Sequence, residues 1–242
     1  MALAHTETGR LLEVVDKLEE QDWSRPTDCA EWDVKALLSH VLGSMEFNAG
    51  TWEMLRQFGL ATRDSKRTGR AMIDEMNARQ VAEHAHMAPS ELARALHRMG
   101  PKAVRGRRRT PAPLRAVRMR PGPPVDGKVP FGYLIGVIVN RDLWMHRIDL
   151  TRATGHEHVL TPEHDGRIVA DVVADWARGH NQPVTLTLEG PAGGTFTQGR
   201  EGADYRLDAV EFCRILGGRA QGSGLLEHTP FRPAPPATPP RG

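Results

Sequence analysis

The sequence predicts an α+β fold that is mainly helical, with a helical N-terminal domain followed by a small α+β domain. Apolar residues recur at helical spacing through most of the chain before Gly155. Beyond that glycine the pattern changes, and residues 184–188 alternate apolar and polar side chains as a strand does. We therefore expect domains at residues 1–155 and 156–229, and a disordered proline-rich tail at 230–242.

Composition argues against polyanion-binding, disulfide-rich, secreted and membrane-spanning proteins. The chain has 242 residues and a formal net charge of +2, so acids and bases nearly balance and the whole molecule is not an obligate polyanion binder. Cys29 and Cys213 are far apart and do not indicate a disulfide framework. The N-terminus lacks a secretory signal pattern, and no uncharged apolar run is long enough to span a membrane. We expect a cytoplasmic protein that does not bind membranes.

Four apolar stripes predict the helices of the first part of the chain. These helices cover about residues 6–21, 33–56, 71–85 and 89–99. Asp33 is a typical N-cap for the second of them. His40 lies at the border of the second stripe, where a histidine reaches either a cavity between helices or solvent. His84, His86 and His97 are expected at the surface or at helix ends.

Residues 101–128 differ from the rest of the chain in charge and proline content. They hold nine Lys or Arg against one acid, Asp126, together with six prolines, and Arg107–Arg109 is the densest point. The segment contains no aromatic residue on which a base could stack, which argues against nucleic-acid binding. We expect a long, partly extended loop here.

A helix that opens near Pro130 carries the most informative pattern. Its apolar face becomes polar halfway along, where Asp142, His146 and Asp149 follow the apolar positions. Asp142 and His146 are one turn apart, which is a common helical arrangement for two metal ligands. A buried histidine hydrogen-bonded to the Asp one turn earlier has the same spacing, so the spacing leaves both interpretations open.

The C-terminal part predicts a small α+β domain. We expect helices at about residues 161–178 and 209–216, and strands at about 184–188, 195–197 and 205–207. Asp208 is the expected N-cap of the last helix, which ends at Gly217. Cys213 lies on this helix and is expected to fill the core.

Three segments together resemble a known family. Residues 32–41, preceded by Trp23, resemble the second-helix signature of the DinB-like metalloenzyme superfamily. Residues 141–149 resemble the fourth-helix motif of its mycothiol-dependent maleylpyruvate isomerase branch, and residues 212–219 are similar to the end of that branch's C-terminal domain. The resemblance implies a DinB-like four-helix bundle followed by a small SCP2-like α+β domain.

The same resemblance implies a divalent metal, usually zinc, held by His40, Asp142 and His146 with one position left open. Two imidazoles and one carboxylate are typical ligands of catalytic zinc. The isomerase type has Glu where this chain has Asp142, so the carboxylate arm is one methylene shorter, which would weaken the site or let a water bridge the acid to the metal. Neither Cys29 nor Cys213 is spaced like a further ligand.

The function implied is a mycothiol-dependent isomerase or S-transferase, in which the ionised thiol adds to a small electrophilic metabolite. Arg214 or Arg219 would hold a substrate carboxylate, or would instead pair with the last carbonyls of its helix. Asp149 would orient a ligand histidine, or would instead pair with Arg147 or Arg152.

Two other functions remain open from the sequence. A metal that activates water rather than a thiol would make the protein a hydrolase or a cyclising enzyme. A helical binding protein without metal, with residues 101–128 contacting an acidic partner, is the second alternative.

Overall fold

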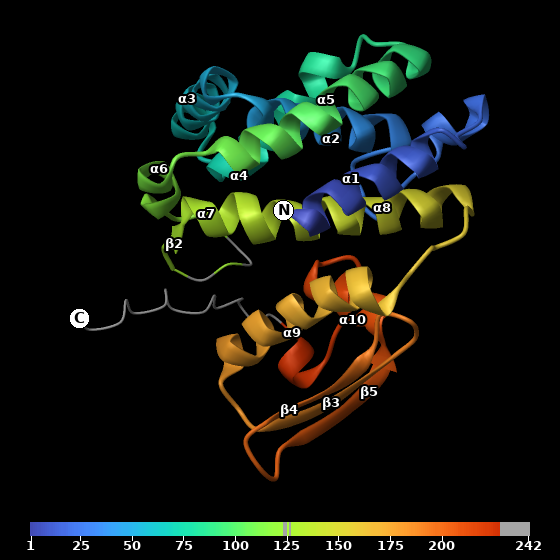
Figure 1. The fold of residues 1–242 in the computed structure, drawn as a ribbon, viewed down its shortest axis with the longest axis vertical. Coiled ribbons are helices and arrows are strands. Elements are labelled where there is room, and N and C mark those ends of the chain that lie inside the picture. Colours follow the sequence, from blue (N-terminus) through green and yellow to red (C-terminus); the bar gives the residue numbers. More distant parts are fainter. Residues whose placement is uncertain (123–124, 126, 228–242) are drawn as a thin grey trace. The chain divides into compact units, whose positions relative to one another are not determined.

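The computed structural model describes residues 1–122, 125 and 127–227. The predicted fold class is confirmed: the chain is α+β and mainly helical (Figure 1). It divides into a helical unit, residues 1–118 with 130–159, and a second unit, residues 119–129 with the chain from 160 onward. The disordered tail predicted at 230–242 lies outside the described residues. Within the described part, no helix is both long enough and apolar enough to cross a membrane.

Four helices of the helical unit pack in a closed ring. They are α1 (Ala2–Val15), α2 (Val34–Ala49), α5 (Pro89–Arg109) and α8 (Val139–Thr154). Both α1 and α2 contact α5 and α8, so the apolar stripes of all four meet in one core. That core includes Leu11, Leu37, Leu38, Leu42, Leu92, Leu96 and Leu150. Two further helices, α3 (Thr51–Thr68) and α4 (Met72–His84), pack against α2.

Two predicted boundaries near the N-terminus are wrong. The second helix does not continue to residue 56, because Gly50 is extended (φ −158°, ψ 146°) and separates α2 from α3. The first helix begins at Ala2, ends at Val15 and is followed by a separate 3₁₀ turn, Glu20–Ser24.

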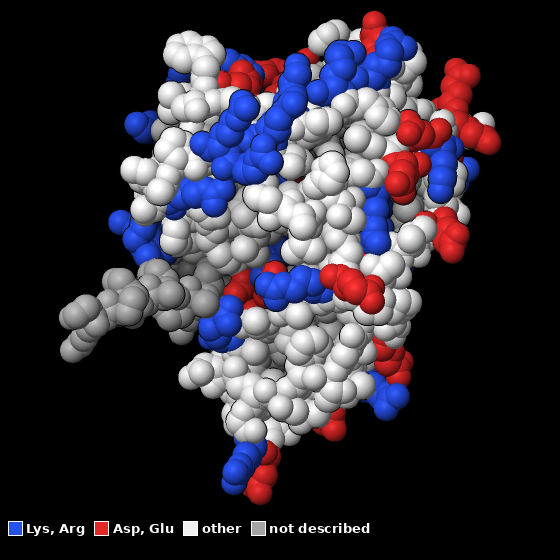
Figure 2. All heavy atoms as spheres, in the orientation of Figure 1, with Lys and Arg blue, Asp and Glu red and all other residues white. Residues whose placement is uncertain are grey.

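The basic segment is helical where we expected a loop. Helix α5 continues through Pro101 to Arg109, and a short helix α6 (Ala112–Ala116) follows, so the predicted loop 101–128 is wrong over these residues. The inward face of α5 continues past the proline, since Ala103 and Arg107 are buried while the neighbouring basic residues are exposed. Figure 2 shows Lys and Arg side chains gathered over this part of the helical unit.

Four short segments lead from α6 into α8. Strands β1 (Arg118–Met119) and β2 (Val129–Pro130) are followed by α7 (Phe131–Tyr133), a π-helical turn (Leu134–Ile138) and then α8. The helix that we expected from Pro130 is therefore present, but a π turn interrupts it before Asp142. Such turns are frequent near functional sites.

The second unit is built on a mixed three-stranded sheet. Its strands are β3 (Val184–Glu189), β4 (Gly194–Gln198) and β5 (Ala203–Asp208), in the order β4-β3-β5. The central strand pairs antiparallel with β4 and parallel with β5, and its alternate residues are buried. A π turn (Pro162–Gly166) precedes helix α9 (Arg167–His180), which contacts helix α10 (Ala209–Leu216) through Trp176 and Phe212.

One glycine determines how closely α5 approaches the end of α2. A Cβ added at Gly106 would lie 2.1 Å from the backbone oxygen of Asn48, a contact that only a shift of one helix would relieve. We expect Gly106→Ala to lower the free energy of unfolding by about 1–3 kcal/mol. The measurement is urea unfolding followed by circular dichroism.

Gly9→Ala is the matched control, because Gly9 lies in α1 with no atom within 4 Å of an added Cβ. That substitution should be neutral or stabilising by up to about 1 kcal/mol. Equal stability of the two variants would contradict the close approach of α5 to α2.

Candidate metal centre

The three predicted ligands come from two helices that contact each other across the bundle. His40 lies in the middle of α2, whose N-terminus is capped by Asp33 through a 2.7 Å hydrogen bond from the Ala36 N–H. Asp142 and His146 lie one turn apart on α8. Both histidines are buried, so the border position of His40 faces the interior rather than solvent.

The ligand atoms of these residues converge. Nε2 of His40 lies 3.7 Å from Oδ2 of Asp142, and Nε2 of His146 lies 3.4 Å from Oδ1 of the same carboxylate. The two imidazole rings are 5.0 Å apart and nearly perpendicular. One ligand atom from each residue lies within 4.8 Å of the other two, and 44% of the Asp142 side chain is exposed. The cluster is therefore closed by two buried rings and open at its carboxylate.

Each nitrogen of His146 has a different environment. Nδ1 lies 3.2 Å from Oδ2 of the fully buried Asp149, which fixes the ring orientation. Nε2 is buried and makes no hydrogen bond of good geometry within the described residues. A carboxylate behind one nitrogen, with the other nitrogen directed into the cluster, is the usual arrangement of a metal-binding histidine.

The charges in the cluster shift its pKa values in opposite directions. Burial alone would lower the pKa of His146, but the carboxylate of Asp142 outweighs it and raises that pKa well above the ordinary value. Partial burial would raise the pKa of Asp142, yet the His146 and His40 rings hold it well below the usual range. Burial lowers the pKa of His40, with Asp142 only partly opposing this. Without metal, the cluster holds one ion pair beside one neutral imidazole.

A loop before α2 covers the histidines. The Trp32 ring lies 4.9 Å from the His40 ring and 6.2 Å from the His146 ring. Sγ of Cys29 lies 3.5 Å from Oδ2 of Asp149 and interacts with His146 as well. The sequence did not predict that Cys29 lies beside Asp149 and His146. Cys29 is in a loop, so no helical spacing relates it to residues of α8.

A model of the mycothiol maleylpyruvate isomerase N-terminal domain family matches residues 4–151. The chain belongs to this family. Two crystal structures, of the mycothiol-dependent maleylpyruvate isomerase and of a histidine-to-alanine mutant of it, resemble the chain with TM-scores of 0.58 and 0.57. Sequence identities are 15% and 16%, and each alignment covers 96% of this chain and 94% of the other, so the likeness extends to the fold of both units. No curated protein sequence matches the chain.

Arg147 and Arg152, the two alternative partners expected for Asp149, form ion pairs with other carboxylates. Arg147 pairs with the buried Glu7 of α1 at 2.7 Å, and Arg152 pairs with Asp28 at 2.9 Å. Both arginines that were alternative partners of Asp149 therefore have other carboxylates, and Asp149 faces His146.

The two arginines predicted to hold a substrate carboxylate lie in the second unit. Arg214 is buried, pairs with Glu211 at 2.5 Å and reaches the backbone oxygen of Arg219. Arg219 donates to the backbone oxygen of Gly217 at 3.1 Å. These contacts are those of arginines at a helix end, and a substrate-binding role for either residue remains a prediction.

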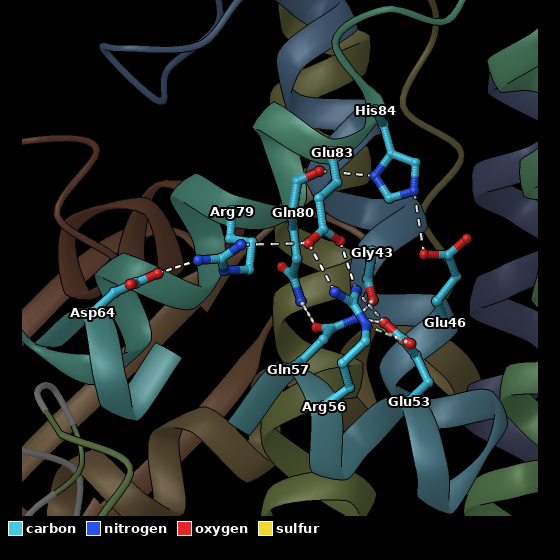
Figure 3. A network of polar contacts seen from close by, with 10 residues as sticks. All are labelled: Gly43, Glu46, Glu53, Arg56, Gln57, Asp64, Arg79, Gln80, Glu83 and His84. Atoms are coloured by element: carbon cyan, nitrogen blue, oxygen red, sulfur yellow. Dashed lines mark hydrogen bonds and ion pairs between the residues drawn. The ribbon is translucent and has the colours of Figure 1, made fainter. Parts of the chain in front are cut away.

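His84 lies at a helix end, as expected, because it is the last residue of α4. It is buried, with Nδ1 2.8 Å from the backbone oxygen of Gln80 and Nε2 3.2 Å from Glu46 (Figure 3).

The opposite pKa shifts predict a distinctive titration of the metal-free protein. In a ¹H–¹⁵N NMR titration, His146 should titrate above the ordinary value of 6.5 and His40 below it. Because the pKa of His146 is raised in the folded state, its ion pair stabilises the fold fully below about pH 6.5 and loses this effect as pH rises through the folded-state value.

Asp142→Asn is the matched variant, since it removes the charge and leaves the burial. The pKa of His146 should then fall. Unchanged titration of His146 in this variant would contradict the assignment of Asp142 as its partner.

Proposed function

We propose that the protein is a metal-dependent enzyme that activates the thiol of mycothiol for reaction with a small electrophilic metabolite. The observation that carries the proposal is the convergence of His40, Asp142 and His146 from two helices, with the buried Nε2 of His146 facing the Asp142 carboxylate at 3.4 Å. These donor atoms fit a divalent metal such as zinc. Membership of the mycothiol maleylpyruvate isomerase N-terminal domain family supports the choice of thiol.

Each residue of the cluster has a separate role in the proposed site. His40, Asp142 and His146 would hold the metal, and the positive charge of a bound metal favours the thiolate form of mycothiol at neutral pH. Asp149 keeps the proton of His146 on Nδ1, which leaves Nε2 as a ligand. The exposed side of Asp142 leaves access for the thiol and the substrate.

The reaction proposed is the formation of a carbon–sulfur bond. The thiol releases its proton to solvent. In an isomerisation its sulfur adds to a conjugated double bond, the resulting single bond rotates, and elimination breaks the carbon–sulfur bond to restore the double bond and the thiolate. In a transfer the sulfur displaces a leaving group, which departs with its electron pair, or opens an epoxide, whose oxygen then takes a proton from solvent. Arg214 and Arg219 are proposed as residues that would bind a substrate carboxylate.

Metal content tests the ligand assignment. Protein prepared without chelator should contain stoichiometric zinc or another divalent metal, and His146→Ala should contain none because it lacks one of two imidazole ligands. His97→Ala is the matched control, since His97 is half-exposed and pairs with Asp16. Stoichiometric metal in His146→Ala would contradict the assignment.

The thiol requirement is a separate test on cobalt-substituted protein. Mycothiol should produce a sulfur-to-cobalt charge-transfer band, whereas S-methyl mycothiol, which has no ionisable thiol, should not. Metal binding without this band would favour a thiol-independent hydrolase or cyclase. No metal uptake at all would favour a non-catalytic binding protein.

A further inference from the structure

A buried glutamine packs against α2 one turn away from His40. Gln80 of α4 is only 3% exposed. It packs against Gly43, which follows His40 by one turn of α2, and a Cβ at Gly43 would lie 2.5 Å from Cγ of Gln80. The glycine therefore makes the space through which the Gln80 side chain reaches α2.

Two buried polar atoms on these residues lack a hydrogen-bond partner of good geometry among the described residues. They are Nδ1 of His40 and Oε1 of Gln80. The backbones of the two residues are close neighbours, since Gln80 packs against Gly43, one turn along α2 from His40. A ring N–H and an amide oxygen are complementary, so each atom supplies what the other lacks.

A relay of amides determines the orientation of the Gln80 amide group (Figure 3). Nε2 of Gln57 donates to Oε1 of Glu53 at 2.9 Å and to the backbone oxygen of Gly43 at 3.1 Å. Because both of these groups only accept, the oxygen of Gln57 must point the other way, where it accepts from Nε2 of Gln80 at 2.8 Å. With its amide nitrogen turned toward Gln57, Gln80 presents its oxygen at the other end of the amide, where that oxygen lacks a hydrogen-bond partner of good geometry among the described residues.

The far end of the relay is anchored by ion pairs. Nη2 of Arg56 lies 2.6 Å from Oε1 of Glu53 and 2.6 Å from Oε2 of Glu83. Its hydrogen bond lowers the pKa of Glu53, which keeps that carboxylate ionised and able only to accept. The orientation of each amide therefore follows from a charge held between α3 and α4.

We propose that Gln80 is a positioning residue for the metal centre: its Oε1 accepts the Nδ1 proton of His40 and so directs the Nε2 lone pair toward Asp142 and His146. This inference rests on the proposed role of His40 as a metal ligand. In this proposal Gln80 accepts the Nδ1 proton of His40, just as Asp149 accepts the Nδ1 proton of His146. The acceptor is a neutral amide for His40 and a charged carboxylate for His146.

The test measures the tautomer of His40 and the affinity for zinc. In metal-free protein near pH 7, the ¹⁵N shifts of neutral His40 should place its proton on Nδ1. Gln80→Met keeps the length of the side chain but removes the acceptor, so the proton should move to Nε2 and zinc should bind about 10–100-fold more weakly. Gln80→Glu keeps an acceptor oxygen and should retain the Nδ1 proton.

Asp64→Asn is the matched control, because it weakens the ion pair of Asp64 with Arg79 between the same two helices and leaves the relay intact. It should change neither the tautomer nor the zinc affinity. A wild-type His40 with its proton on Nε2, or an unchanged tautomer and zinc affinity in Gln80→Met, would overturn the inference while leaving the metal centre in place.

A wild-type protein that binds no zinc would instead overturn the proposed function. The tautomer of His40 in that protein would still decide whether Gln80 orients the ring. If Gln80→Met does not fold, Gln57→Met tests the same relay one step further from His40, since Gln80 could then turn its amide over.

Discussion

The candidate site depends on the contact between α2 and α8, because its three predicted ligands, His40, Asp142 and His146, belong to these two helices. His40 comes from the first and Asp142 and His146 from the second, and a distance of 3.4–3.7 Å between carboxylate and imidazole atoms requires the helices to keep their relative rotation and height. One residue of slip would rotate a ligand by about 100° away from the cluster. The apolar core thus determines the geometry on which the proposed chemistry rests.

Several features outside the cluster hold these helices in register. Glu7 and Arg147 form a buried ion pair that connects α1 to α8, and breaking such a pair leaves a buried charge without compensation. On the other side, Gly106 lets α5 lie against the end of α2. The site is therefore supported by contacts from helices that contribute no ligand.

The sequence predicted the parts of the site that have a local signature. The spacing of Asp142 and His146 on one helix places them together but fits a hydrogen-bonded pair as well as a ligand pair. The choice of a metal site came from the resemblance, as did His40, which by periodicity lies at a border. Cys29 and Gln80 were not predicted, since each reaches the cluster through tertiary packing and neither has a helical period that relates it to a ligand. The basic segment was misread for the opposite reason. Pro101 and a run of arginines are typical of a loop, but the inward stripe through Ala103 keeps the segment helical.

The two histidines have unequal environments, and this inequality bears on the charge of the site. Asp149 places a buried negative charge behind His146, whereas the amide of Gln80 adds none behind His40. With a divalent ion bound as proposed, Asp142 and Asp149 together balance its charge, and neutral imidazoles leave the balance unchanged. A carboxylate in place of the Gln80 amide would be the third in the centre. It would make the net charge negative and would disfavour an incoming thiolate. A neutral acceptor orients the ring equally well and keeps the centre able to attract an anion, which is the electrostatic reason for an amide at this position.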